Sequence, residues 1–149
     1  MLVGEFCNRD VVIVDKTSSV RQASQLMRSQ HVGDLVVVEE RGGQRIPVGI
    51  ITDRDIVLEV IAKDVDLDAV TIGDVMSFDL TTASEDDAVL ETVKLMQAKG
   101  VRRVPVVDKR GALVGILAVD DLIELMQELV GDVSSLIVRE QKREQRKRP

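Results

Sequence analysis

The stretch Gly49-Ile50-Ile51-Thr52-Asp53-Arg54-Asp55 carries a buried strand into the first turn of a helix. A relative of it follows 66 residues later, as Gly115-Ile116-Leu117-Ala118-Val119-Asp120-Asp121. The apolar run after each glycine predicts a strand, and Thr52 with an acid three residues on predicts a capping box at the next helix. The two stretches therefore indicate that one structural unit occurs twice in the chain.

The repeat extends over almost the whole sequence, at an offset of 69 residues before the first copy spends three extra residues in a turn. Identities at the 69-residue offset join Val20, Leu26, Met27, Val32, Val37 and Val38 to Val89, Leu95, Met96, Val101, Val106 and Val107. Identities spread over a whole unit at a fixed offset indicate an internal duplication.

Each copy is predicted to be a βαββα unit, so the fold class is α+β with two such units. The predicted strands are residues 11–14, 35–38 and 48–51 in the first copy, and residues 80–83, 104–107 and 114–117 in the second. The first helix of each unit is entered through Ser18/Ser19 in one copy and through Ser84 with Asp87 in the other. Its apolar face is predicted to hold Val20, Ala23 and Met27, or Val89, Val93 and Met96. The closing helices are predicted to be amphipathic, with Ile56, Val57, Val60 and Ile61, or Leu122, Met126 and Leu129.

The predicted organisation has four parts: a first unit at 1–62, a linker at 63–71, a second unit at 72–130 and a basic helical tail at 131–149. A unit of about 60 residues buries too little apolar surface to be stable alone, so the two should pack face to face. A pseudo-twofold axis would then produce two related clefts between the copies.

Composition restricts the function. The net charge is −6, but residues 139–149 carry +4 and the rest of the chain −10, which argues against nucleic acid as the main partner. The basic tail keeps a weaker nucleic-acid or docking role open. One cysteine, no apolar run of membrane length and no secretory signal predict a cytoplasmic protein.

Catalytic chemistry is not expected. The chain has one histidine and one cysteine, no metal-ligand cluster, and a Gly42-Gly43 pair that fits a hairpin turn rather than a phosphate loop. We therefore predict no catalytic residue, no metal and no catalytic cofactor.

Thr52 and Asp55 permit two interpretations. A capping box explains both residues. An exposed helix N-terminus also presents free N–H groups to an anion, and a carboxylate there can accept hydrogen bonds from the vicinal hydroxyls of a ribose. The local pattern leaves both interpretations open.

The complete pattern resembles a tandem pair of cystathionine-beta-synthase-type (CBS) domains, also called a Bateman module. The resemblance covers residues 3–130 and rests on the two glycine-led stretches together with Val101-Arg102-Arg103-Val104-Pro105-Val106-Val107. It implies that AMP, ADP, ATP, NAD or S-adenosylmethionine binds between the copies. It also implies a homodimer that regulates another protein.

The resemblance also assigns residues to two sites. The main site would use Ile50, Thr52, Arg54, Asp55, Thr81, Thr82, Val101, Arg102 and Arg103. The second would use Ala118, Asp120 and Asp121 with Val12, Ile13, Val32, Gly33 and Asp34. Asp55 would hold the ribose, and arginines would pair with phosphate. Because alanine and added carboxylates replace these groups in the second site, it is expected to be degenerate. Arg102 and Arg103 could alternatively form only a solvated face.

The sequence leaves two main functional hypotheses. The first is an adenine-nucleotide (energy) sensor that signals to a separate, unidentified protein. The second is a structural dimerisation scaffold with vestigial clefts. A weaker third possibility is a transcription-linked regulator that uses the tail on nucleic acid.

Overall fold

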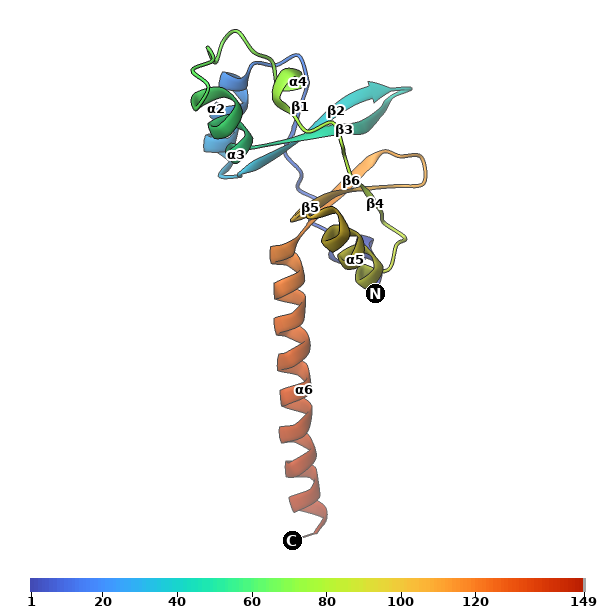
Figure 1. Ribbon diagram of the computed structural model, residues 1–149. Coiled ribbons are helices and arrows are strands. Elements are labelled where there is room, and N and C mark those ends of the chain that lie inside the picture. The colour runs from blue at the N-terminus through green and yellow to red at the C-terminus, as the bar shows by residue number, and fades with distance from the viewer. Residues whose placement is uncertain (149) are drawn as a thin grey trace.

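The computed structural model describes residues 1–148, so Pro149 at the end of the predicted tail lies outside the described residues. Two lobes, each containing a three-stranded sheet, lie together, and one long helix projects away from them (Figure 1). The first lobe contains β1 (Ile13–Val14), α2 (Val20–Gln30), β2 (Asp34–Arg41), β3 (Gln44–Thr52), α3 (Asp53–Ile56) and the π-helix η1 (Val57–Ile61). The second contains β4 (Ala83–Ser84), α5 (Val89–Lys99), β5 (Arg103–Val107), β6 (Leu113–Ala118) and α6 (Val119–Lys147).

The two sheets have the same topology, which confirms the predicted pair of βαββα units. In each sheet the first strand runs parallel to the second, and the second pairs antiparallel with the third. Each sheet also has a register shift at the equivalent place, between Val37 and Val38 and between Val106 and Val107. The three extra residues of the first copy lie in its longer hairpin.

The short helices α1 (Val3–Phe6) and α4 (Ile72–Val75) each pack on the lobe formed by the other copy. Val3 and Cys7 belong to the core of the second lobe, and Ile72 and Met76 belong to the core of the first. Backbone hydrogen bonds fix both crossings, because Asn8 pairs with Ile116 and the Ser77 N–H donates to the Ile50 carbonyl. Local sequence patterns did not predict this exchange.

The exchange explains the glycine at the start of each signature stretch. A Cβ at Gly49 would lie 2.6 Å from Met76 Sδ and 3.0 Å from the Ser77 carbonyl oxygen. A Cβ at Gly115 would lie 2.6 Å from Cys7 Sγ and 2.9 Å from the Asn8 carbonyl oxygen. Glycine is needed at both positions because the crossing segment passes directly over the third strand.

Helix boundaries and faces differ in places from the sequence predictions. α2 begins after the Ser19 cap as predicted, but α5 begins at Val89, and Ser84 with Asp87 forms the turn before it. On α5, Thr92 is buried together with Val89 and Met96, whereas Val93 is exposed. Thr92 Oγ1 donates to the Ala88 carbonyl, which satisfies this buried hydroxyl within its own helix.

The closing helices are less buried than their sequences suggested. In the first lobe Ile56 and Val60 are buried, but Val57 and Ile61, at the two ends of the π-helix η1, are exposed. In α6, Met126 is 64% exposed and Leu129 is 45% exposed, because the helix has left the lobe by that point (Figure 1).

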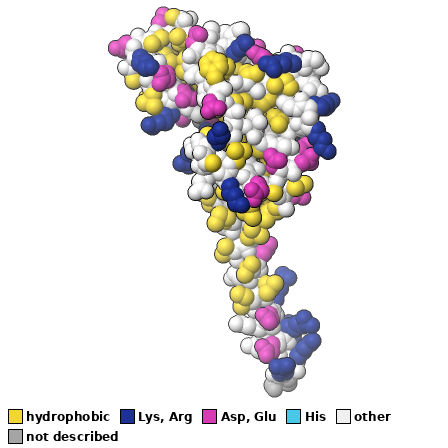
Figure 2. Space-filling model, turned by 45° about the vertical axis from the view of Figure 1, so that its right-hand side comes forward, with side chains coloured by type: hydrophobic (Ala, Val, Ile, Leu, Met, Phe, Trp, Pro, Cys, Tyr) yellow, Lys and Arg dark blue, Asp and Glu magenta, His cyan; other side chains and the backbone are white. Residues whose placement is uncertain are grey.

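α6 runs without a break across the predicted boundary between the second unit and the tail, and all described residues from Met126 onward are exposed. Apolar side chains line much of this projecting stalk, with Lys and Arg gathered toward its end (Figure 2). Among the helices of residues 1–148, none combines the length and apolar character needed to cross a membrane.

Candidate functional site

A cavity of about 490 Å³ lies between the two copies, next to the N-terminus of α3. Three parts of the chain form it: the end of β3 with α3, the segment that crosses from α4 to β4, and the turn between α5 and β5. Its lining residues are Ile50, Thr52, Asp53, Arg54, Asp55, Ser77, Asp79, Leu80, Thr81, Gly100, Val101, Arg102 and Arg103.

A smaller cavity of about 190 Å³ occupies the pseudo-symmetric position next to the N-terminus of α6. The end of β6, the segment that crosses from α1 to β1, and the turn between α2 and β2 form it. Its lining residues are Asn8, Asp10, Val11, Val12, Val32, Asp34, Arg103, Ile116, Ala118, Asp120 and Asp121. The duplication therefore creates two cavities of unequal size.

The capping box at the larger cavity is complete. The Asp55 N–H donates to Thr52 Oγ1 at 3.1 Å, and the Thr52 N–H donates to Asp55 Oδ2 at 2.9 Å. The Asp53 N–H donates to the Gly33 carbonyl at 2.9 Å, which ties the start of α3 to the turn after α2. Asp55 is thereby held at the cavity wall with Oδ1 outside the capping box.

The equivalent box at the smaller cavity is incomplete. The Ala118 N–H donates to Asp121 Oδ2 at 2.8 Å, but Ala118 has no hydroxyl to accept the Asp121 N–H. The Val119 N–H donates to the Arg102 carbonyl at 2.9 Å, which reproduces the link between α3 and Gly33. The backbone is therefore repeated while the side-chain cap is not.

The two cavities also differ in charge. The larger contains the arginines 54, 102 and 103 and the aspartates 53, 55 and 79, so its lining is balanced. The smaller contains the aspartates 10, 34, 120 and 121 against Arg103 alone, so its lining carries an excess of three negative charges. A phosphate would be attracted by the arginines of the first lining and repelled by the carboxylates of the second.

Arg103 lies between the cavities and lines both. Its Nη1 is 2.7 Å from Asp34 Oδ1, and the two side chains are only 29% and 22% exposed. Burial raises the pKa of the Asp34 carboxyl, the Arg103 guanidinium lowers it, and the Asp53 carboxylate raises it. Arg103 therefore has a protein partner already, which the assignment of this arginine to phosphate alone did not anticipate.

The structure brings most of the predicted site residues together at the two cavities. Eight of the nine main-site residues line the larger cavity, and the exception is Thr82, a half-buried residue just before β4. In the second set, Ile13 and Gly33 stand outside the lining, since Ile13 pairs with β2 and Gly33 binds the Asp53 backbone.

Several lining residues were not among the predicted site residues. Ser77, Asp79 and Leu80 reach the larger cavity because the crossing segment passes along it, and Asn8, Asp10 and Val11 do so at the smaller one. The 69-residue offset relates Asn8 to Ser77 and Asp10 to Asp79, so the repeat itself carried this signal.

Groups with catalytic or metal-binding potential are sparse in the part of the chain that the structure describes. Residues 1–148 contain no group of three or more His, Cys, Asp or Glu side chains placed to hold a metal ion. Cys7 is buried, and burial raises the pKa of its thiol, so the reactive thiolate is disfavoured.

Comparison with known families gives two matches to the model described as the CBS domain, at residues 3–62 and 72–128. Among curated relatives, an uncharacterised protein of Methanopyrus kandleri is 38% identical over 131 residues, which are 88% of this chain and 65% of that protein. An inosine-5′-monophosphate dehydrogenase of Methanocaldococcus jannaschii is 32% identical over 116 residues, 78% of this chain and 22% of the enzyme.

Solved structures agree with this match. A CBS domain pair in complex with 5′-methylthioadenosine and S-adenosyl-L-methionine aligns with a TM-score of 0.74 at 27% identity, covering 86% of this chain and 97% of that one. A hexameric CBS-CP12 protein from bloom-forming cyanobacteria aligns with a TM-score of 0.73 at 25% identity, covering 83% and 66%. The chain thus spans about two thirds of the Methanopyrus protein and a small part of the dehydrogenase.

Proposed function

Because the chain belongs to the CBS domain family and carries two copies of that domain, we propose that it is a regulatory module for an adenine nucleotide. The ligand, of the AMP, ADP or ATP class, binds in the larger cavity, and the module signals its presence to a separate protein. The observation that carries this proposal is the combination, around one cavity, of a fixed Asp55 carboxylate with Arg54 and Arg102, beside the paired Arg103.

Each group has a chemical role in this proposal. Asp55 Oδ1 accepts hydrogen bonds from the ribose hydroxyls, because Oδ2 is used in the capping box. Arg54 and Arg102 pair with phosphate oxygens through charge-assisted hydrogen bonds. Adenine lies against Ile50, Leu80 and Val101, and backbone groups read its edge because the lining contains no aromatic side chain.

Two of the comparisons support an adenosine-containing ligand and a regulatory role. One similar CBS pair was solved with 5′-methylthioadenosine and S-adenosyl-L-methionine, both of which contain adenosine. Another relative is a dehydrogenase in which the matching part covers only 22% of the enzyme, as expected for an accessory domain. The arginines of the larger cavity favour a nucleotide over an adenosine-containing ligand without phosphate.

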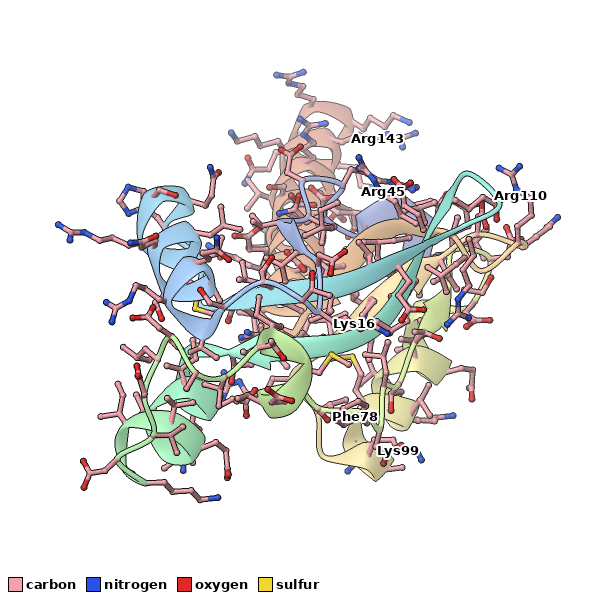
Figure 3. All side chains as sticks on the ribbon, turned by 90° about the horizontal axis from the view of Figure 1, so that it is seen from above. Lys16, Arg45, Phe78, Lys99, Arg110 and Arg143 are labelled. Carbon is pink, nitrogen blue, oxygen red and sulfur yellow. The ribbon has the colours of Figure 1, made fainter. Side chains whose placement is uncertain are left out.

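Isothermal titration calorimetry with AMP, ADP, ATP and 5′-methylthioadenosine tests the proposal. We expect one strong site per chain for a nucleotide, and Arg102→Ala should weaken it about tenfold or more, since a charge-assisted hydrogen bond contributes about 1.5–3 kcal/mol. Arg110→Ala is the matched control, because Arg110 lies on the β5–β6 turn outside both cavities (Figure 3). Two equivalent sites, or no binding at millimolar nucleotide, would contradict the proposal.

A second candidate function is a self-associating scaffold. The exposed apolar residues of α6 favour it, and a similar CBS protein is hexameric. If the protein forms an oligomer but binds none of the four ligands, the scaffold is the better description. If it binds one nucleotide per chain, sensing is the better description whatever the oligomeric state.

A further inference from the structure

The outer part of α6 is a helix that has no partner among residues 1–148. Every residue from Met126 to Lys147 is exposed, and this part of α6 projects from the lobes (Figure 1). At 1.5 Å per residue it is about 30 Å long. Intrinsic helix propensity alone gives an isolated helix of this length only marginal stability in water. In proteins most of the stability of a helix comes from packing its apolar face against another element.

Apolar side chains form a continuous stripe along α6 (Figure 2). The stripe consists of Ile123, Met126, Leu129, Val130, Val133, Leu136 and Ile137, each between 45% and 69% exposed. The spacing alternates between three and four residues, as in helices that pair side by side. The stripe is thus suited to another helix, and not to a sheet edge or a small ligand.

Charge divides α6 into two halves. Residues 119–134 contain five acidic side chains and no basic one, a charge of −5. Residues 135–148 contain six basic and two acidic side chains, a charge of +4. Such a helix is complementary to a copy of itself that runs in the opposite direction, and it is repelled by a copy that runs in the same direction.

We propose that α6 pairs antiparallel with α6 of a second copy of this chain. The apolar stripes meet, and the acidic half of each helix lies along the basic half of the other. The stripe would then be buried without any contribution from the two cavities. This pairing surface is separate from the proposed nucleotide site and stands or falls independently of it.

Asp132 and Arg139 provide a direct measure of helix direction. They are seven residues apart, so they lie on the same side of α6, and both line one shallow groove beside Leu136. An antiparallel partner brings its own Arg139 toward Asp132, whereas a parallel partner keeps residues of equal charge side by side. Arg143 lies nearer the end of the helix and points outward from it (Figure 3).

The first experiment measures the mass of the full chain in solution by light scattering. We expect twice the chain mass of 16.4 kDa, or a larger even multiple. Val133→Asp, in the middle of the stripe, should reduce the mass by half. Val138→Asp makes the same substitution outside the stripe and outside the groove lined by Asp132 and Arg139, and it should leave the mass unchanged. A wild-type monomer, or equal effects of both variants, would overturn the proposal.

The second experiment measures direction. Arg139→Glu should weaken association, and adding Asp132→Arg to it should restore association, because the opposite charges then face each other again. In a parallel pair neither change alters the balance of like charges, so an unchanged dissociation constant in both variants would overturn the antiparallel arrangement. Circular dichroism of each variant checks that the lobes remain folded, since all of these positions lie outside both cores.

Discussion

The two cavities between the lobes are built on the same backbone, and they differ in a handful of side chains. At the larger one Thr52 completes a cap around Asp55, and arginines balance the aspartates. At the smaller one Ala118 leaves the cap half made, and four aspartates face a single arginine. In this duplicated fold the backbone geometry of the site has been kept in both copies, whereas its charge has not. Substitutions at equivalent residues of the two copies test whether this difference in charge decides which cavity binds the ligand.

The largest expected difference concerns the two equivalent aspartates. Asp55→Ala should lower nucleotide affinity about 10- to 100-fold, because a hydrogen-bonded carboxylate contributes about 1.5–3 kcal/mol. Asp121→Ala removes the same kind of cap contact at the smaller cavity and should leave that affinity nearly unchanged. Calorimetry on both variants measures the difference. Equal losses would show that the cavities are functionally alike, and no loss in either would remove Asp55 from the site.

The glycines test whether the copies are structurally equal. Gly49→Ala and Gly115→Ala each push a Cβ against the crossing segment, so each should lower the free energy of unfolding by about 1–3 kcal/mol. Urea denaturation measures both. A matched control is Gly131→Ala on α6, where nothing lies near the added Cβ and stability should not fall. A large effect in one lobe only would contradict the symmetry of the exchange.

The cap residues Thr52 and Ala118 occupy equivalent positions, so each can be replaced by the residue found in the other copy. Thr52→Ala should cost about 1 kcal/mol of stability, since it removes the acceptor for the Asp55 N–H. Ala118→Thr supplies the missing acceptor for Asp121 and should stabilise the protein by roughly 0.5–1 kcal/mol. Denaturation curves that move in the same direction for both variants would show that the cap at the smaller cavity is not simply incomplete.

The smallest expected effect concerns the ion pair between the cavities. Asp34→Asn should release Arg103 for a phosphate and raise ATP affinity about threefold, in line with the modest strength of a partly exposed pair. Adenosine, which has no phosphate, is the control ligand and should bind equally to both proteins. An ATP affinity that falls in the variant would mean that Asp34 positions Arg103 for the ligand instead of competing for it.

The same pair predicts a dependence on pH. Burial raises the pKa of Asp34, so the folded state holds this proton more tightly than the unfolded state. Ionised Asp34 therefore lowers stability above its folded-state pKa, and that loss is recovered as the pH falls. Since protonation also releases Arg103, the difference in ATP affinity between wild type and Asp34→Asn should narrow as the solution is made more acidic. A constant difference across pH would contradict this.

Much of the fold followed from the sequence because the evidence was repeated. Val37 and Val106 are equivalent residues of the two copies, and both lie in buried strands. Each copy therefore supports the strand assignment made for the other. The repeat does not predict that α1 and α4 each pack on the lobe of the other copy. Val3 and its equivalent in the second copy, Ile72, are both apolar, and nothing local to either residue specifies which of the two similar cores buries it.

The site was predictable to the extent that it depends on sequence-local geometry. Thr52 and Asp55 cap a helix wherever that helix lies, so their contact followed from spacing alone. The pairing of Arg103 with Asp34 joins residues 69 positions apart that the repeat treats as equivalents, and equivalents are not expected to touch. They touch because both lie beside the pseudo-twofold axis, a property of the packed lobes.

The exchanged segments bear on how such a chain could have arisen. A gene encoding a single copy would specify a lobe whose leading segment has no place in its own core and whose core lacks the segment it needs. Two such chains could complete each other by trading these segments, and fusing the genes would make that trade permanent within one molecule. Each copy of the repeat therefore encodes a lobe together with the segment that completes the other lobe. Cutting the present chain at the linker would remove from each core the residues that the other copy supplies.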